Sequence, residues 1–463
     1  MTARANRQSN RLLNGFGLRA LWQPVTTAAL VGAATPALAQ VVPLYGEVVS
    51  APWNSQRVFE RTPLPQLDDP QTTEPPAPED TPVRTRQHPG YEPVGIRSGP
   101  WMLNPALTSG LLYDSNVFSS NTNRRSDLAA VVEPSLRART MWDRHGLDLK
   151  VGAQTTQYKE NSSLNQTNYG IRGTGWFDVT RDLVMLTSFQ ASHLNEGVGS
   201  LASPANAVKP TPYDLFSGDV TVRKQFNRWA TALGVGVDSY DFGSTRALDG
   251  STIRQDARDG QIYVVHGRTD YAVSPNLGWF ASAEYNARDL RGTSTQSLSS
   301  QGVRALTGLN IALTRLVTGE FGVGYVRQRF EDRAIGTIDG PAYSAAITWR
   351  PTRLIDVNFK AEQIVTQTSD TSVTGVLANN FQLGVDYELL RNVVVSVAGS
   401  FEKDRFHGQP RRDEVATLDS RIKYLPNRFG TISVFHRFTE RDSNVPTFSY
   451  QKHLVGFNAT AQF

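Results

Sequence analysis

The sequence contains no cysteine, so neither disulfide bonds nor thiolate metal ligands contribute to the fold. After the N-terminal region, no apolar stretch approaches the roughly 20 residues that a membrane-spanning helix requires. Neither charge sign dominates, since the 463 residues include 47 Lys and Arg and 43 Asp and Glu. The resulting net charge of +4 disfavours nucleic acid as a partner.

The motifs of the common enzyme families are also missing. There is no G-x-S-x-G elbow, no H-E-x-x-H, no phosphate-binding P-loop and no group of metal ligands close together. The seven histidines are scattered, and only His436 and His453 fall on neighbouring terminal strands, facing outward. A membrane lipase would need more than this pair, and packing at the membrane interface explains it better. We therefore predict a protein that is not an enzyme and binds neither a cofactor nor a metal.

The N-terminus has the pattern of a secretory signal peptide. Four arginines and no acidic residue precede a mostly apolar stretch from Ala20 to Ala34, and Ala37-Leu38-Ala39 follows. A basic region, an apolar region and an A-x-A site in this order predict cleavage after Ala39 and export of the remainder. The alternative is a membrane anchor, but polar residues such as Gln23 shorten the apolar stretch.

The composition changes between Gln40 and Pro100, where about half of the 25 prolines fall among acidic residues. Such a segment cannot bury enough apolar surface to offset its ordering entropy, so we expect residues 40–100 to form an extended, mobile periplasmic tail. A spacer is the simpler interpretation. The alternative is a tail that binds periplasmic partners or partly occludes a pore.

From Trp101 to Phe463 the sequence alternates apolar and polar residues in runs of about ten to thirteen. The alternation is clearest in Leu277–Leu290, Leu354–Glu362 and Phe381–Leu389. This period of two indicates strands with one apolar face and one polar face. Helical periodicity is not sustained anywhere in this region.

The connections between these runs alternate in length. Short turns such as Asn227-Arg228 and Arg391-Asn392 are followed by long polar stretches such as Asn195–Pro212 and Gly243–Gly260. Bacterial membrane barrels have short periplasmic turns and long extracellular loops. We therefore predict an all-β fold, a single up-and-down antiparallel transmembrane barrel of about 18 strands over residues 101–463; about 16 strands also fit.

The aromatic residues and the C-terminus support the same architecture. Rings such as Trp229 and Trp349 lie beside short turns, and rings such as Tyr158 and Phe216 lie near long loops, as in the two aromatic belts of a membrane protein. The chain ends at Phe463, which alternates in phase with Phe457 and Val455. This ending resembles the terminal aromatic signal that the barrel assembly machinery recognises in outer-membrane proteins.

The polar face of the strands would line the lumen, and its charges are unevenly distributed. A basic wall is expected on the early and the last strands, which become neighbours when the barrel closes, and an acidic wall on the arc between them. The expected basic residues are Arg137, Arg139, Lys150, Arg172, Arg223, Arg421, Lys423 and Arg437. The expected acidic residues are Asp238, Glu284, Glu320, Asp356, Glu362, Asp386, Glu388 and Glu402. Such walls would create a transverse field that orients polar solutes. Alternatively, the charges form salt bridges that only brace the barrel.

Short motifs at the start of the region resemble a known family. Tyr113-Asp114-Ser115-Asn116-Val117-Phe118 is followed by Ser126-Asp127 and by Pro134-Ser135. In these motifs residues 101–463 resemble the putative β-barrel porin 2 family, whose members are outer-membrane barrels of proteobacteria. Several are encoded with exopolysaccharide synthesis and export genes, so the resemblance implies a conduit for polysaccharide.

Together, the sequence predicts a pore in the bacterial outer membrane that exports polysaccharide or lets polar solutes diffuse. Its expected partners are outer-membrane lipid, the barrel assembly machinery and periplasmic export proteins reached through residues 40–100. The alternative is a structural or partner-binding barrel with a filled lumen. Long loops such as Asn195–Pro212 are candidates to fold inward and set the pore size.

Overall fold

The structure is a computed structural model, and it describes residues 82–84, 86, 88–200, 203–204, 206–294, 296–314, 316–332, 336–366 and 375–463. The predicted signal peptide, residues 1–39, and the tail up to residue 81 lie outside the described residues. No helix in the described ranges is long and apolar enough to cross a membrane.

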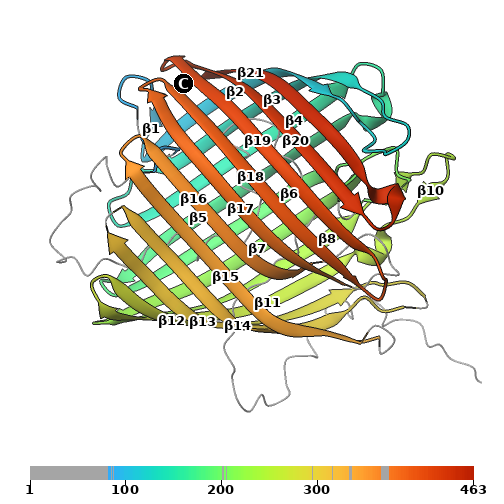
Figure 1. Cartoon of the computed structure of the whole chain (residues 1–463). Helices are drawn as coiled ribbons and strands as arrows, with labels where there is room; N and C mark the ends of the chain where they lie inside the picture. The colour runs from blue at the N-terminus through green and yellow to red at the C-terminus, as the bar shows by residue number, and fades with distance from the viewer. Residues whose placement is uncertain are drawn as a thin grey trace, which may run out of the picture.

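The described chain forms one closed antiparallel barrel (Figure 1). The sheet has 19 strands, of which the short β1 (Ile96–Ser98) pairs only with β2, so 18 strands make the wall. These strands are β2 (Trp101–Asp114), β3 (Asp127–Thr140), β4 (His145–Tyr158), β5 (Gln166–Thr180), β6 (Leu183–Glu196), β7 (Thr211–Phe226), β8 (Trp229–Phe242), β11 (Gly260–Ser274), β12 (Leu277–Leu290), β13 (Ser300–Thr314), β14 (Val317–Phe330), β15 (Thr337–Thr352), β16 (Ile355–Thr366), β17 (Gly375–Leu390), β18 (Val393–His407), β19 (Arg412–Asn427), β20 (Gly430–Ser443) and β21 (Tyr450–Gln462). The predicted all-β barrel of 18 strands is confirmed.

The wall follows directly from the alternation in the sequence. In β12, Trp279 and Tyr285 point outward, whereas Phe280 and Glu284 point inward and are buried. Outward residues on other strands, such as Leu111 and Val323, are exposed. A strand with period two presents one face to each side of the sheet, so closure brings all the apolar faces to the outside.

The turns and loops separate the two ends of the barrel. Two-residue turns such as Asn227-Arg228, between β7 and β8, lie at the end where β2 begins, which we call the short-turn end. Asn227 has a positive φ of 50°, a conformation that asparagine adopts more readily than most residues. Longer connections lie at the opposite, long-loop end, and one of them carries the two-stranded hairpin β9 (Thr245–Arg246) and β10 (Thr252–Ile253).

The first and last strands close the barrel. Strand β21 pairs with β2, so that Leu107 lies opposite Ala461 and Leu111 lies opposite Phe457. The backbone N–H of Phe463 donates to the carbonyl of Pro105, and the Phe463 ring stacks on Phe429 at the short-turn end. Phe463, Phe457 and Val455 all face outward and are exposed.

The structure corrects one member of the expected aromatic belts. Tyr158 lies opposite Ala129 and faces inward, where it packs on a buried apolar cluster that includes Leu112 and Val131. Its position at the last residue of β4 placed it near a long loop, but its phase within the strand puts it on the inner face. The outward rings near that end include Tyr169, Phe216 and Tyr325.

Candidate pore lumen

All the residues predicted for the two charged walls lie on the inner face of the barrel. Cross-strand partners in an antiparallel sheet share a face. For example, one row runs from Arg137 through Lys150 and Arg172. Another row runs from Asp356 through Asp386 to Ser396 and Arg421. The alternation in the sequence therefore predicts which of these residues line the inner face.

Several of these charges form ion pairs. Arg137 binds Asp148 on the next strand through its Nε, at 2.9 and 3.0 Å from the two carboxylate oxygens. Arg437 binds Asp419, also on a neighbouring strand, with 2.5 Å between Nε and Oδ1. Pairing of this kind is what the bracing alternative expects. A net transverse field across the lumen remains a prediction.

Arg268 makes the most extensive of these contacts. Its guanidinium lies 2.8 Å from both Asp270 and Glu320, and its Cζ lies 4.2 Å from the ring centroid of Phe280. Glu320, from the expected acidic wall, therefore faces an arginine that interrupts that wall. Two carboxylates and an aromatic face hold this guanidinium against the barrel wall.

Several acidic residues of the expected wall are buried rather than open to the lumen. Glu284 is 0% exposed, and Asp238, Asp356, Asp386 and Glu388 are also buried. By contrast, the side chain of Arg137 on the early strands is 51% exposed. Solutes in the lumen would therefore meet the basic side of the wall more readily than these acids.

Part of the expected tail lies inside the barrel, which corrects the spacer interpretation for these residues. The N–H of Val83 donates to Asp356 at 2.5 Å. Arg84 lies 2.9 Å from Asp386, and Arg86 lies 2.8 Å from Glu388. We call the described residues 82–84, 86 and 88 the luminal segment.

These contacts place the luminal segment across the short-turn end. Asp356 is the second residue of β16, and Asp386 and Glu388 are near the end of β17. The chain then continues through β1 into β2, several strands away around the barrel (Figure 1). Two carboxylates of the expected acidic wall, Asp386 and Glu388, are thus paired with arginines from the N-terminal region. The sequence offered only a weak signal for this, two arginines at the end of an acidic, proline-rich stretch.

One long loop, Asn195–Pro212, which the sequence analysis named as a candidate to fold inward, contacts distant strands at the opposite end. The carbonyl of Gly199 accepts a hydrogen bond from the Tyr450 hydroxyl at 3.1 Å, and that of Ser200 accepts one from Arg441 at 3.4 Å. Because Tyr450 and Arg441 lie on β21 and β20, the loop between β6 and β7 reaches far around the barrel mouth.

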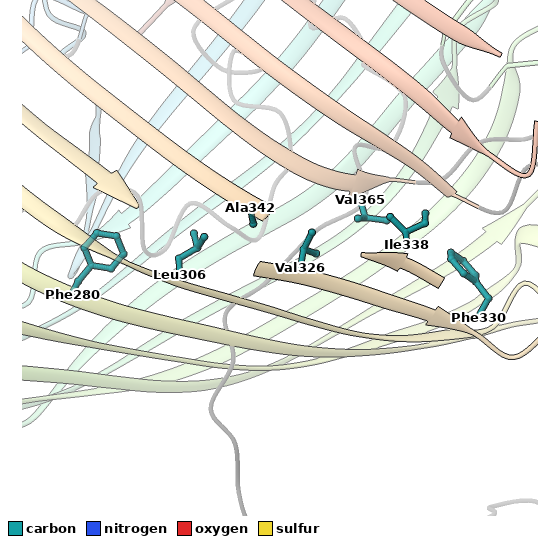
Figure 2. Packing of buried hydrophobic residues seen from close by; sticks show 7 residues of the cluster. All are labelled: Phe280, Leu306, Val326, Phe330, Ile338, Ala342 and Val365. Atoms are coloured by element: carbon teal, nitrogen blue, oxygen red, sulfur yellow. The ribbon is translucent and has the colours of Figure 1, made fainter. Parts of the chain in front are cut away.

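The end of the β16–β17 hairpin also leaves the wall. Pairing between β15 and β16 stops at Ser344 and Glu362, although β15 continues for seven residues toward the long-loop end. Val365 is buried beside Ile338, and its carbonyl accepts a hydrogen bond from the inward-facing Arg288 at 3.3 Å (Figure 2). The hairpin therefore leans over the inner faces of the preceding strands.

Apolar residues fill part of the interior, which the sequence analysis did not anticipate. Phe280, Leu306, Val326, Phe330 and Ile338 form one buried cluster with Ala342 and Val365 (Figure 2). A second cluster lies on the inner face of β6–β11, and a third is the one that contacts Tyr158. These residues occupy the face that the alternation assigned to polar side chains. Burial beneath inward segments explains their apolar character.

A lumen-facing tryptophan was also missed. Trp176 lies opposite Gly146 and Leu186, in the row that continues to the buried Thr221. Its exposed fraction is 44%. The sequence held a signal for it, because Trp176 has the same phase along β5 as Arg172.

The histidines show no chemical constellation. His436 and His453 face outward on β20 and β21, and their rings stack with centroids 5.4 Å apart and 3.1 Å between Nε2 and Nδ1. Such a stack fits the packing role expected for this pair. Within the described ranges, no group of three or more His, Asp or Glu side chains could hold a metal ion.

Comparison with known proteins identifies the family. The model of the family described as "Putative beta-barrel porin 2" matches residues 88–463. No curated protein matches the chain.

Several solved structures match the chain at low identity. The siderophore receptor PirA from Pseudomonas aeruginosa matches with 10% identity and a TM-score of 0.42, covering 80% of this chain and 81% of its own. OpdL from Pseudomonas aeruginosa matches with 11% identity and a TM-score of 0.42, covering 79% and 99%. The receptor PirA from Acinetobacter baumannii matches with 8% identity and a TM-score of 0.43, covering 78% and 80%. The assignment rests on the family model: the chain belongs to the putative beta-barrel porin 2 family.

Proposed function

We propose that this porin-family barrel is an outer-membrane pore that passes polar solutes, and that it serves as a conduit for polysaccharide export. The observation that carries the proposal is a closed 18-strand wall that is apolar outside and ionic inside. An apolar outer band suits lipid, and charged side chains on the inner face suit water and polar solutes. Polysaccharide as the cargo follows from the family resemblance.

The membership in a porin family and the exposed outward residues support location in the bacterial outer membrane. Lipid would contact outward residues such as Leu111 and Val323. The exposed Phe463 and Phe457 are suited to recognition by the barrel assembly machinery. Periplasmic export proteins would reach the pore through residues 40–100.

A second candidate, a structural or partner-binding barrel with a filled lumen, is favoured by a specific observation. The luminal segment crosses one end, the loop after β6 contacts distant strands at the other, and the β16–β17 hairpin leans inward there. Four buried apolar clusters add to the filling. The two candidates differ in whether a continuous aqueous path remains.

Single-channel recording of the refolded chain in planar bilayers distinguishes them. A pore gives discrete, stable conductance steps, and a filled barrel gives none. The same recording is made with Arg84→Ser/Arg86→Ser, which removes two of the ion pairs of the luminal segment. Silence in both proteins would overturn the pore. Cargo is tested separately, since a chromosomal deletion that leaves secreted polysaccharide unchanged would overturn the export assignment.

A further inference from the structure

The inner face of β3, β4 and β5 carries an unusual row of like charges. Arg137, Lys150 and Arg172 lie directly opposite one another on three successive strands. Like charges in directly opposed positions destabilise a sheet. Arg139 adds a fourth cation one inward position further along β3.

Nearby acids offset only part of this charge. Asp148 binds Arg137, and Glu133 accepts a hydrogen bond from Gln154 at 3.3 Å on the same wall. The positive charge is concentrated in two adjacent rows, where Asp148 is the one carboxylate beside Arg137, Arg139, Lys150 and Arg172. The other inward carboxylates of β3–β5, which are Asp127, Glu133 and Asp178, lie on either side of these rows. Rings or rows of Arg and Lys are the usual selectivity element of anion-conducting pores.

An aromatic platform lies beside these cations. The ring of Trp176 lies over Gly146, where an added Cβ would stand 1.8 Å from the indole Cζ2 atom. Any side chain at position 146 would therefore displace the ring. The glycine lets the indole lie against the barrel wall with its other side toward the lumen, and 44% of the residue is exposed.

This part of the wall is open. The exposed fraction of the Arg137 side chain is 51%, whereas Glu284, on the β12 part of the wall, is 0% exposed. The luminal segment binds Asp356, Asp386 and Glu388 on β16 and β17, away from β3–β5. Solute in the lumen therefore has access to the indole of Trp176 and to Arg137, with Lys150 and Arg172 half-buried beside them.

We infer that Trp176 and the cations Arg137, Arg139, Lys150 and Arg172 form a binding site for an acidic oligosaccharide. A sugar ring packs on the indole face, and carboxylates on adjoining sugars pair with the guanidinium and ammonium groups. Trp176 and Arg172 are four residues apart on one strand, a separation of about 13 Å. That span exceeds a single sugar, so the ligand is an oligomer rather than a free uronic acid.

This site rests on the proposed function and names the class of cargo. Binding can be measured without conductance, so the site and the pore are tested separately. Isothermal titration calorimetry uses the full chain refolded in detergent, with a hexamer of galacturonate as the probe. Maltohexaose tests the requirement for charge, and free galacturonate tests the requirement for length. We expect binding of the acidic hexamer alone, weakening as salt is raised because exposed ion pairs are screened.

Variants assign the binding to this site. Trp176→Ala and, separately, Arg139→Gln/Lys150→Gln should each weaken hexamer binding by about tenfold. The matched controls are Trp349→Ala and Arg329→Gln, which change outward, exposed residues and should leave binding unchanged. A Trp176→Phe variant should retain most of the affinity, since it keeps an aromatic face.

Three outcomes would overturn the inference: equal binding of maltohexaose, equal binding of free galacturonate, or no loss in the Trp176 and Arg139/Lys150 variants. Circular dichroism and heat-modified gel mobility of each variant exclude unfolding as the cause of lost binding. A barrel that binds the hexamer but conducts no current would refute the pore and retain the site. A barrel that conducts but does not bind would refute the site and retain the pore.

Discussion

The alternation of the sequence predicts which residues face inward, but it does not distinguish inward residues that pack in an apolar core from those that carry charge. Phe280 and Glu284 lie on the inner face of β12 on either side of Ser282, and both are buried. Phe280 packs against Leu306 and carries the Arg268 guanidinium on its face. An inner-wall phenylalanine of this kind stabilises the barrel by excluding water from a charged cluster.

Replacing Phe280 with alanine should lower the free energy of unfolding by about 3–5 kcal/mol, because it leaves a cavity inside the wall. Phe280 is 1% exposed, so neighbouring atoms surround the whole ring. Urea unfolding in lipid vesicles, followed by tryptophan fluorescence, measures the change. Phe321→Ala is the matched control, since Phe321 faces outward where lipid chains fill the lost volume. A loss no larger than that of the control would contradict an inner core at Phe280.

At the scale of single elements, the loops are held by contacts of very different strength. Arg258, in the short helix η3 (Asp256–Arg258), binds Glu196 at the end of β6 with both guanidinium nitrogens at 3.0 Å. Both side chains are buried, and the Arg258 Cζ lies 3.9 Å from the Phe242 ring centroid. In the same loop, Arg254 and Asp256 form an exposed pair.

Glu196→Gln should destabilise the protein by about 3–5 kcal/mol, because it leaves the charge of Arg258 buried without a counter-ion. The loop between β8 and β11 should then be cleaved faster by added protease. The control Arg254→Gln removes an exposed ion pair and should change neither stability nor cleavage, since water screens such pairs. Similar behaviour of the two variants would show that burial of the Glu196 pair has no energetic consequence.

The luminal segment is a second element whose anchoring can be tested. Asp386→Asn/Glu388→Gln removes the charges that bind Arg84 and Arg86. If the pore is open, the segment should leave the short-turn end and single-channel conductance should rise. Raising salt should produce a smaller increase in the unchanged protein once its conductance is divided by the conductivity of the bulk electrolyte, because Arg84 is partly exposed and its pairing is screened.

The control for this experiment is Glu414→Gln, which removes an outward ion pair with Lys403. Its conductance should equal that of the unchanged protein. Unaltered conductance in the Asp386/Glu388 variant, with the control also unaltered, would show that the luminal segment does not limit the flow of ions.

At the scale of the whole molecule, closure depends on the terminal strand. The Phe463 backbone bonds to Pro105, and its ring contacts Phe429 at the edge of the outer face. Substituting the ring leaves the backbone hydrogen bonds between β2 and β21 intact. Folding in lipid and recognition in the cell can therefore be separated.

Phe463→Ala should reduce the amount of barrel in the outer membrane of cells at least several-fold while leaving refolding into vesicles nearly unchanged. Heat-modified mobility on gels measures folded protein in both settings. Val434→Ala, a change to another exposed outward residue of the neighbouring β20, is the control. Equal loss in cells and in vesicles would mean that Phe463 acts through stability and not through recognition.

The sequence by itself determined the wall of this barrel. The period of two in runs such as Leu277–Leu290 specifies which residues face outward, and that range coincides with β12. Turn residues such as Asn227 and the alternating lengths of the connections set the strand count and the two ends. These features depend on local backbone geometry, which a short stretch of sequence encodes.

Only the tertiary structure decided what occupies the lumen. Arg84 and Arg86 bind carboxylates 302 positions away in the sequence. Val365 of β16 packs against Ile338 of β15 beyond the point where the two strands stop pairing. Arg137 and Glu284 both face inward, yet the Arg137 side chain is exposed and Glu284 is buried. Burial inside a closed barrel depends on which distant segments cross it, and the alternation along a strand carries no information about that crossing.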